Sequence, residues 1–166
     1  MRSSLATDQE FKLWLLLYRT REAIYKARQK ELNEYGITPR HAAVLRAVKI
    51  IGSKATPAEI SRCLHVRPHA VSTMVSRMEK AGLVRKRKDL DRKNLTRVVL
   101  TEKGKQLLQQ STRRQSIHSI MSSLGEEERR RLMSYLETLW FAATKEAGAD
   151  LKAPFAPYEE TLETEA

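Results

Sequence analysis

The chain has 166 residues, with 31 Lys and Arg against 20 Asp and Glu, a net charge of +11 and a pI near 10.0. This length corresponds to one domain, or to one domain with an extension, and the hydrophobic content of 41% excludes a wholly disordered chain. No apolar run reaches the roughly 18 residues of a membrane span, and no secretory leader is evident, so we expect a cytoplasmic protein, in keeping with its single cysteine, Cys63.

The first two predicted helices are separated by a glycine. Residues 8–35 lack Pro and Gly and are rich in Leu, Ala, Arg, Lys and Glu, which predicts one long helix that Gly36 closes. Thr38 and Pro39 then begin a second helix as the N-cap and the first-turn proline. Its apolar stripe follows helical spacing and comprises Val44, Leu45, Val48 and Ile51.

A short third helix is predicted from Thr56 to about Val66. Thr56 and Glu59 have the spacing of a capping box, in which each side chain bonds the backbone amide of the other residue. Ile60 and Leu64 lie four residues apart and are expected to face the core together.

The fourth helix is predicted from Pro68 to about Ala81 and has two contrasting faces. The apolar face comprises Val71, Met74, Val75 and Met78, and the polar face comprises His69, Ser72, Thr73, Ser76 and Lys80. Short hydrogen-bonding side chains allow a helix to approach base edges in a major groove. The alternative is an ordinary solvated helix face, but Ser and Thr are mediocre helix formers.

A basic β-hairpin is predicted next. Residues 83–88 and 95–100 have strand character and flank a polar turn at 89–94. Residues 62–97 hold 11 Lys and Arg against three acids, which favours nucleic acid as the partner and an anionic membrane surface second. Charged hairpins can also be solvated edges, but directly after the polar-faced helix this one is better interpreted as a wing that reaches phosphates or a minor groove.

Two helices and a tail complete the chain. Thr101 is expected to cap a fifth helix that continues to about Leu124, and a sixth helix begins after Gly125 and ends at Gly148. Residues 149–166 contain one Lys and five acids, and Pro154 and Pro157 prevent the helix from continuing. This tail is either a solvated acidic extension or a segment that tempers non-specific DNA binding.

The order of these elements resembles the multiple-antibiotic-resistance regulator (MarR) family of winged-helix transcription factors. The resemblance covers roughly residues 8–146 and depends on three groups of residues: Ile37-Thr38-Pro39; Val71-Ser72 with residues 75–84; and Asp91-Arg92-Lys93 followed by residues 99–104. It implies a mainly α fold, in which a winged helix-turn-helix with a small β-hairpin wing is flanked by dimerisation helices.

The resemblance also implies an obligate homodimer that binds a pseudo-palindromic DNA duplex. The implied segments are a dimerisation helix at 1–36, the DNA-binding domain at 37–101, further dimerisation helices at 102–148 and the acidic tail at 149–166. The expected dimer-interface residues are Phe11, Trp14, Leu132, Leu136, Leu139 and Trp140.

The predicted DNA-contacting residues belong to the fourth helix and the hairpin. They are Arg67, His69, Ser72, Thr73, Ser76, Arg77, Arg85, Arg87, Lys88, Arg92 and Lys93. Two features depart from the family pattern. Asp91-Arg92 lies one residue further from Leu100-Thr101 than is usual, and the fourth helix begins with Arg67-Pro68-His69-Ala70 where relatives often have small hydroxyl residues.

Other sites have weaker support. Cys63, His65 and His69 lack a fourth metal ligand, so no metal or cofactor is expected. Cys63 could instead act as a redox switch, since positive surroundings favour thiolates. Trp14, Tyr18 and Trp140 are expected in the dimer core, although relatives often bind small aromatic or phenolic anions nearby.

The sequence shows no catalytic motif, so we do not expect an enzyme. The favoured function is a dimeric transcriptional repressor that a small aromatic anion releases. The alternative is a structural or non-specific nucleic-acid-binding module without a regulatory ligand.

Overall fold

The computed structural model describes the backbone of residues 2–88 and 95–148, and the side chains of these residues from position 8 onward. The wing tip with Arg92 and Lys93, and the acidic tail, lie outside the described residues. The elements in chain order are α1 (Arg2–Asn33), α2 (Pro39–Ile51), the 3-10 turn η1 (Gly52–Lys54), α3 (Pro57–Leu64), α4 (Pro68–Lys80), β1 (Val84–Lys88), β2 (Thr96–Leu100), α5 (Glu102–Ser111), α6 (Gln115–Met121) and α7 (Glu126–Glu146).

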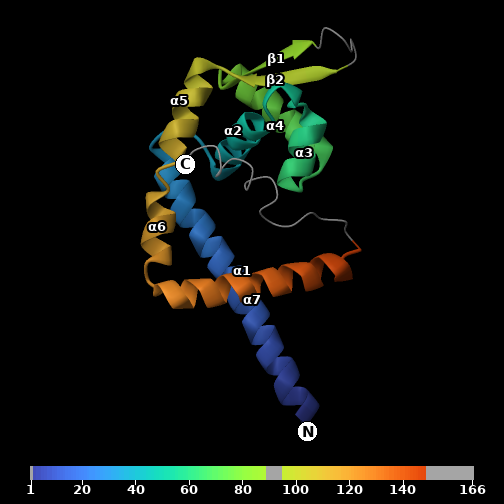
Figure 1. The fold of residues 1–166 in the computed structure, drawn as a ribbon, viewed down its shortest axis with the longest axis vertical. Coiled ribbons are helices and arrows are strands. Elements are labelled where there is room, and N and C mark those ends of the chain that lie inside the picture. The colour runs from blue at the N-terminus through green and yellow to red at the C-terminus, as the bar shows by residue number, and fades with distance from the viewer. Residues whose placement is uncertain (1, 89–94, 149–166) are drawn as a thin grey trace.

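The core lies where α2, α3, α4 and the hairpin meet, at one end of the molecule (Figure 1). Its fully buried side chains include most of the predicted inward faces of these helices: Val44, Leu45, Ile60, Val71, Val75 and Met78. The predicted inward residues Ile51, Leu64 and Met74 are only partly buried against this core. The two strands pair antiparallel, with Val84 opposite Leu100 and Lys88 opposite Thr96. The Val98 amide also donates to the Ala55 carbonyl (2.8 Å), which joins the hairpin to the segment after η1.

The predicted N-caps of the second and third helices are confirmed, with one difference in bonding, whereas the first helix begins at Arg2 and not at residue 8. Thr38 caps α2, and His41 returns the bond because its Nδ1 accepts from the Thr38 amide at 3.4 Å. Thr56 caps α3 by accepting from the Glu59 amide at 3.2 Å. The expected return bond from the Glu59 carboxylate is replaced by an ion pair with Arg62 at 2.9 Å, one turn along the exposed side of the helix.

The prediction of a single fifth helix is wrong, because the helix is interrupted between α5 and α6. Ser111 and Thr112 turn their hydroxyls back onto the carbonyls of Leu108 (2.7 Å) and Gln109 (2.6 Å). Arg114 then adopts a left-handed backbone conformation, with φ of 49°. Local side-chain bonds of this kind compete with the helical hydrogen bonds.

A buried ion pair on α1 stabilises this break. Arg28 and Glu31 lie 2.7 Å apart, with only 12% and 9% of their side chains exposed. The Arg28 guanidinium donates to the Ser111 carbonyl at the end of α5. The Glu31 carboxylate accepts from the amides of Gln115 (2.9 Å) and Ser116 (3.1 Å) at the start of α6. These bonds satisfy backbone groups that a continuous helix would have paired internally.

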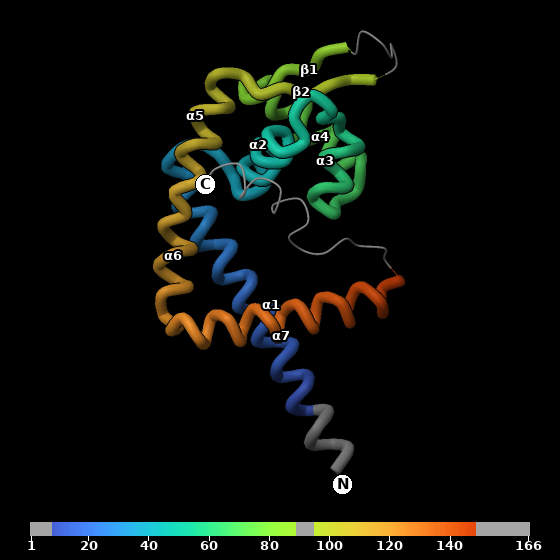
Figure 2. Tube along the Cα trace, in the orientation of Figure 1, coloured from blue at the N-terminus to red at the C-terminus, as the bar shows by residue number. Residues whose placement is uncertain are grey.

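The helices outside the core form an extended support. In Figure 1, α5 and α6 stand in a column beside the second half of α1, and α7 turns away to cross the long axis of α1. Figure 2 shows that α1 just after residue 8 and most of α7 project from the rest of the subunit. No helix in the described part of the chain is both long and apolar enough to cross a membrane.

Candidate nucleic-acid interface

Helix α4 presents its polar face to solvent. Its inward residues Val71, Val75 and Met78 are fully buried, which fixes the rotation of the helix. The side chains on the opposite face are consequently exposed: Arg67, His69, Ser72, Thr73 and Arg77. The two-faced pattern in the sequence is therefore confirmed, and the short polar side chains are free to approach a macromolecular surface.

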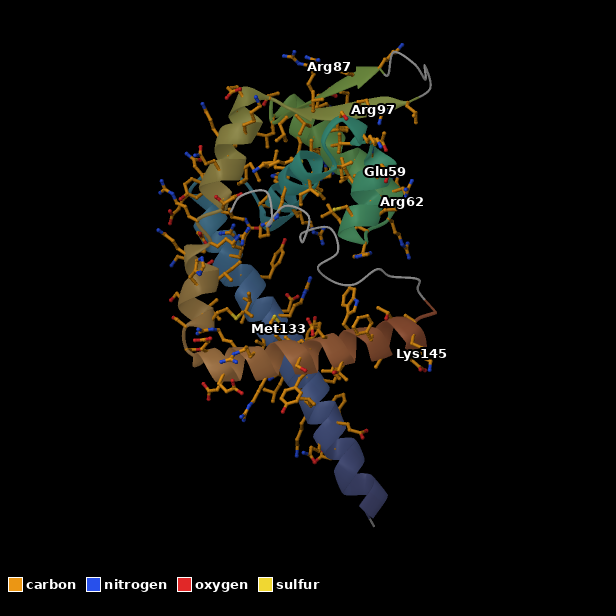
Figure 3. All side chains as sticks on the ribbon, viewed as in Figure 1. Glu59, Arg62, Arg87, Arg97, Met133 and Lys145 are labelled. Atoms are coloured by element: carbon orange, nitrogen blue, oxygen red, sulfur yellow. The ribbon has the colours of Figure 1, made fainter. Side chains whose placement is uncertain are left out.

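Strand β1 adds positive charge directly after α4. Arg85, Arg87 and Lys88 are exposed. Arg87 lies on the outer side of the hairpin, away from the helical body (Figure 3). The predicted cationic strand and polar helix face thus belong to neighbouring elements of one unit.

Ser76 is a predicted site residue, and its hydroxyl already has hydrogen-bond partners within the subunit. Its Oγ donates to the Ser72 carbonyl (2.9 Å) and accepts from the Lys86 Nζ (2.7 Å). A hydroxyl has one donor and two lone pairs, so Ser76 retains a single acceptor position for another partner.

Lys86 is a residue that the sequence analysis missed. Besides its bond to Ser76, its backbone amide donates to Glu79 Oε1 at 2.8 Å and its ammonium lies 3.4 Å from Glu79 Oε2. The backbone bond from Lys86 is the main reason that the pKa of the Glu79 carboxyl is lowered. The alternation of side chains along the strand could have identified Lys86, because Lys86 lies on the same face of the strand as the buried Val84.

The start of α5 holds the turn between α4 and the wing. Thr101 Oγ1 donates to the Gly82 carbonyl (2.6 Å) and accepts from the Gly104 amide (3.0 Å). Lys103 Nζ donates to the Ala81 carbonyl at 3.1 Å. The turn is therefore anchored to the supporting column of helices.

The predicted dimer-interface residues are mostly exposed in the single subunit. On α1, Phe11 stacks on Trp14 and Trp14 on Tyr18, with ring centroids 5.6 and 5.9 Å apart. Trp14 remains 57% exposed and Leu136 of α7 43% exposed. Helix α7 has no buried residue at all. Exposed apolar surface on this scale is typical of an interaction site.

Helices α6 and α7 together form an apolar hollow of about 580 Å³. It is lined by Met121, Arg129, Leu132, Met133, Leu136, Glu137, Leu139 and Trp140. The indole Nε1 of Trp140 is buried without a hydrogen-bond partner. The Trp140 ring also lies 6.0 Å from the ring of His65, which occupies the turn between α3 and α4.

The structure does not bring Cys63, His65 and His69 together as a set of metal ligands. Among the described residues, no group of three or more His, Cys, Asp or Glu is placed to hold a metal ion. Burial raises the pKa of the half-buried Cys63 thiol, which disfavours the thiolate that the redox hypothesis requires.

These features define a winged-helix DNA-binding protein, with α3 and α4 as the helix-turn-helix and β1 and β2 as the wing. A MarR family model matches residues 35–93. The chain belongs to the MarR family of transcriptional regulators.

Three solved structures show the range of similarity. The organohalide-sensing transcriptional regulator RdhR-CbdbA1625, solved with 2,4-dichlorophenol, is 32% identical, with 79% of each chain covered and a TM-score of 0.73. A mutant of MarR from E. coli, complexed with operator DNA, shares the fold at 20% identity, with coverage of 80% of this chain and 96% of that one and a TM-score of 0.73.

BpsR from Bordetella bronchiseptica, whose DNA binding is regulated by 6-hydroxynicotinic acid, shares the fold at 18% identity. The match covers 77% of this chain and 98% of BpsR, with a TM-score of 0.68. No curated protein sequence matches the chain significantly.

Proposed function

We propose that this protein is a homodimeric, sequence-specific transcriptional repressor that binds a pseudo-palindromic operator. One observation carries the proposal: the exposed polar face of α4 lies next to the cationic strand β1. A helix supplies base contacts in a major groove, while neighbouring cations bind phosphates and hold the register.

The contacts divide into two groups. His69, Ser72 and Thr73 contact base edges, together with the remaining acceptor position of Ser76. Phosphates are bound by Arg67, Arg77, Arg85, Arg87 and Lys88. For the wing tip, we propose from the sequence pattern of the turn that Arg92, Lys93 or Asn94 enters the adjacent minor groove.

The homodimer is supported by the apolar surface that α1 and α7 leave uncovered. Burying Phe11, Trp14, Leu132, Leu136, Leu139 and Trp140 against a second copy removes this surface from water. Two subunits related by a two-fold axis then place two α4 helices about one turn of DNA apart, which is why the operator should be near-palindromic.

A small aromatic anion is the proposed effector, and the hollow on α6 and α7 supports this choice. The hollow is apolar, Trp140 has an unpaired N–H donor, and Arg129 supplies positive charge at its wall. Four of its lining residues belong to the proposed dimer interface, so we propose that the effector binds where the two subunits meet. The RdhR-CbdbA1625 structure contains 2,4-dichlorophenol. Quenching of tryptophan fluorescence by a chlorophenol, with loss of DNA binding, is the expected result; a Trp140→Phe variant tests the contribution of the N–H.

Selection of duplexes from a random DNA library tests the main proposal. We expect the full chain to enrich a near-palindrome and to protect both half-sites in a footprint. For about eight phosphate contacts per dimer, the slope of log K against log salt should be about −7. Salt-dependent binding without an enriched sequence would instead support the non-specific nucleic-acid-binding module, and a slope near zero would remove the electrostatic argument.

A further inference from the structure

Lys86, Glu79 and Ser76 form a polar cluster between α4 and the wing, here called the Lys86 cluster. The Lys86 ammonium donates to Ser76 Oγ at 2.7 Å and pairs with the Glu79 carboxylate at 3.4 Å. The same carboxylate accepts from the Lys86 amide at 2.8 Å. The cluster therefore connects two successive turns of α4 to both the backbone and the side chain of one residue in β1.

The environment of Lys86 separates it from the other cations of its strand. Its side chain is 31% exposed and that of Glu79 37%, whereas Arg85, Arg87 and Lys88 are exposed. Its charge is balanced by Glu79, an acid in the otherwise basic stretch of α4. A lysine whose charge is already paired gains less from a phosphate than an unpaired one, because it must give up its partner.

The position of the Lys86 cluster affects how β1 is held relative to α4. The Leu83 amide bonds the Met78 carbonyl at 2.9 Å and fixes the turn that leaves α4. Beyond this turn, the polar contacts of Lys86 with Ser76 and Glu79 join β1 directly to α4. These contacts hold the inner half of β1 against α4, so they bear on the direction in which the outer half of the strand, with Arg87 and Lys88, leaves the helix.

We propose that Lys86 is a positioning residue that sets the angle between α4 and the wing, and that this angle is required for discrimination between DNA sequences. The inference rests on the proposed function. In a specific complex, α4 and the wing must reach their groove and their phosphates simultaneously, so small errors in their relative placement reduce affinity. Phosphate contacts to an unrelated duplex carry no sequence information and adapt to a loosened wing.

The test compares Lys86→Met with Lys88→Met, which removes an exposed lysine two residues further along the same strand. Affinities are measured over a range of salt for two duplexes: one enriched by the wild-type protein, and a scrambled duplex of equal length and composition. We expect Lys86→Met to weaken binding to the enriched duplex by about ten-fold, the effect of losing a charge-assisted hydrogen bond, with little change for the scrambled duplex and no change in salt slope. Lys88→Met should weaken both duplexes alike and reduce the slope by about 1 per subunit.

A second variant, Glu79→Gln, keeps the test independent of Lys86 itself. It removes the charge that pairs with Lys86 on the side of α4, so it should reproduce the loss of discrimination between the two duplexes. The double variant Glu79→Gln with Lys86→Met should lose no more discrimination than either single variant. Circular dichroism at the assay temperature verifies that each variant is folded. If Lys86→Met does not fold, the discrimination shown by Glu79→Gln decides whether the inference is correct.

The outcomes separate this inference from the proposed function. If Lys86→Met behaves like Lys88→Met, Lys86 is a phosphate contact and the inference is wrong. It is also wrong if both cluster variants discriminate as the wild type does. If the wild type enriches no duplex, the proposed function itself fails before any variant is compared.

Discussion

Glu31 on α1 holds the start of α6 through its carboxylate, and its ion-pair partner Arg28 bonds the end of α5. Burial alone would raise the pKa of its carboxyl, but hydrogen bonds from the side chains of Ser116 and Arg28 and from the amides of Ser116 and Gln115 lower it from 4.5 to about 2. The ionised form is therefore the one that the folded state stabilises. The consequence is a dependence of stability on pH that the sequence does not suggest.

The first prediction concerns acid unfolding. Because the folded pKa of Glu31 is depressed, its contribution is fully present above the unfolded value and is lost as the pH falls from about 5 towards 2. Glu31→Gln should reduce the free energy of unfolding at pH 7 by about 3 kcal/mol, since it leaves the Arg28 charge without its partner. It should also flatten the pH dependence, as measured by urea unfolding at several pH values. Equal destabilisation by the exposed Glu34→Gln would contradict this account.

The second prediction concerns Gly104 at the start of α5. A Cβ on this residue would lie 2.0 Å from the Leu83 carbonyl oxygen, which is backbone and cannot move aside independently. Gly104→Ala should therefore lower the free energy of unfolding by about 1–3 kcal/mol. The control is Gly125→Ala, where the nearest atom is a flexible carboxylate oxygen at 3.4 Å, so the loss, measured by thermal unfolding, should be smaller and limited to the preference for Gly over Ala at the N-cap of α7.

At the scale of the element, our proposal gives α4 and β1 different roles in binding DNA. The helix is held by three fully buried apolar side chains, so its polar face has one fixed direction. The strand carries the exposed cations Arg85, Arg87 and Lys88, which in our proposal bind phosphates and not base edges. Substitutions in the two elements should consequently have different signatures.

The third prediction makes this difference measurable. Thr73→Ala should weaken binding to the enriched duplex by roughly 10-fold and leave the scrambled duplex unaffected, since a lost base contact costs discrimination. Arg87→Ala should weaken both duplexes and lower the salt slope by about 1 per subunit. Fluorescence anisotropy titrations at several salt concentrations provide both quantities. An Arg87→Ala variant with unchanged slope would show that the wing does not bind phosphate.

At the scale of the whole molecule, the subunit leaves extensive apolar surface exposed on α1 and α7. Helix α7 buries no residue, and the stacked aromatic side chains at the start of α1 remain in water. A helix with this much exposed apolar surface is not stable by propensity alone and needs a packing partner. The second copy of the chain supplies it in our proposal.

The fourth prediction tests this interface. Leu136→Glu should convert the dimer into a monomer in sedimentation velocity and reduce operator affinity, because burying an unpaired carboxylate is costly. Thr138→Glu adds the same charge two residues away, on the opposite side of α7, and should leave the dimer intact. A Leu136→Glu protein that remains dimeric would place the interface elsewhere.

The local structure could be predicted from the sequence. The starts of α2, α3 and α5 follow from Thr38, Thr56 and Thr101, each of which caps its helix as expected. The inward faces of α2 and α4 follow from apolar spacing. These features depend on residues within one or two helical turns of each other, so a linear pattern contains the information.

Contacts between distant residues could be decided only by the tertiary structure. The break between α5 and α6 depends on Arg28 and Glu31, whose bonds span 83 and 84 residues of sequence. The partners of Ser76 likewise depend on the strand that brings Lys86 back to α4. Which polar groups meet is determined by how the buried apolar faces pack together, and no local pattern records that arrangement.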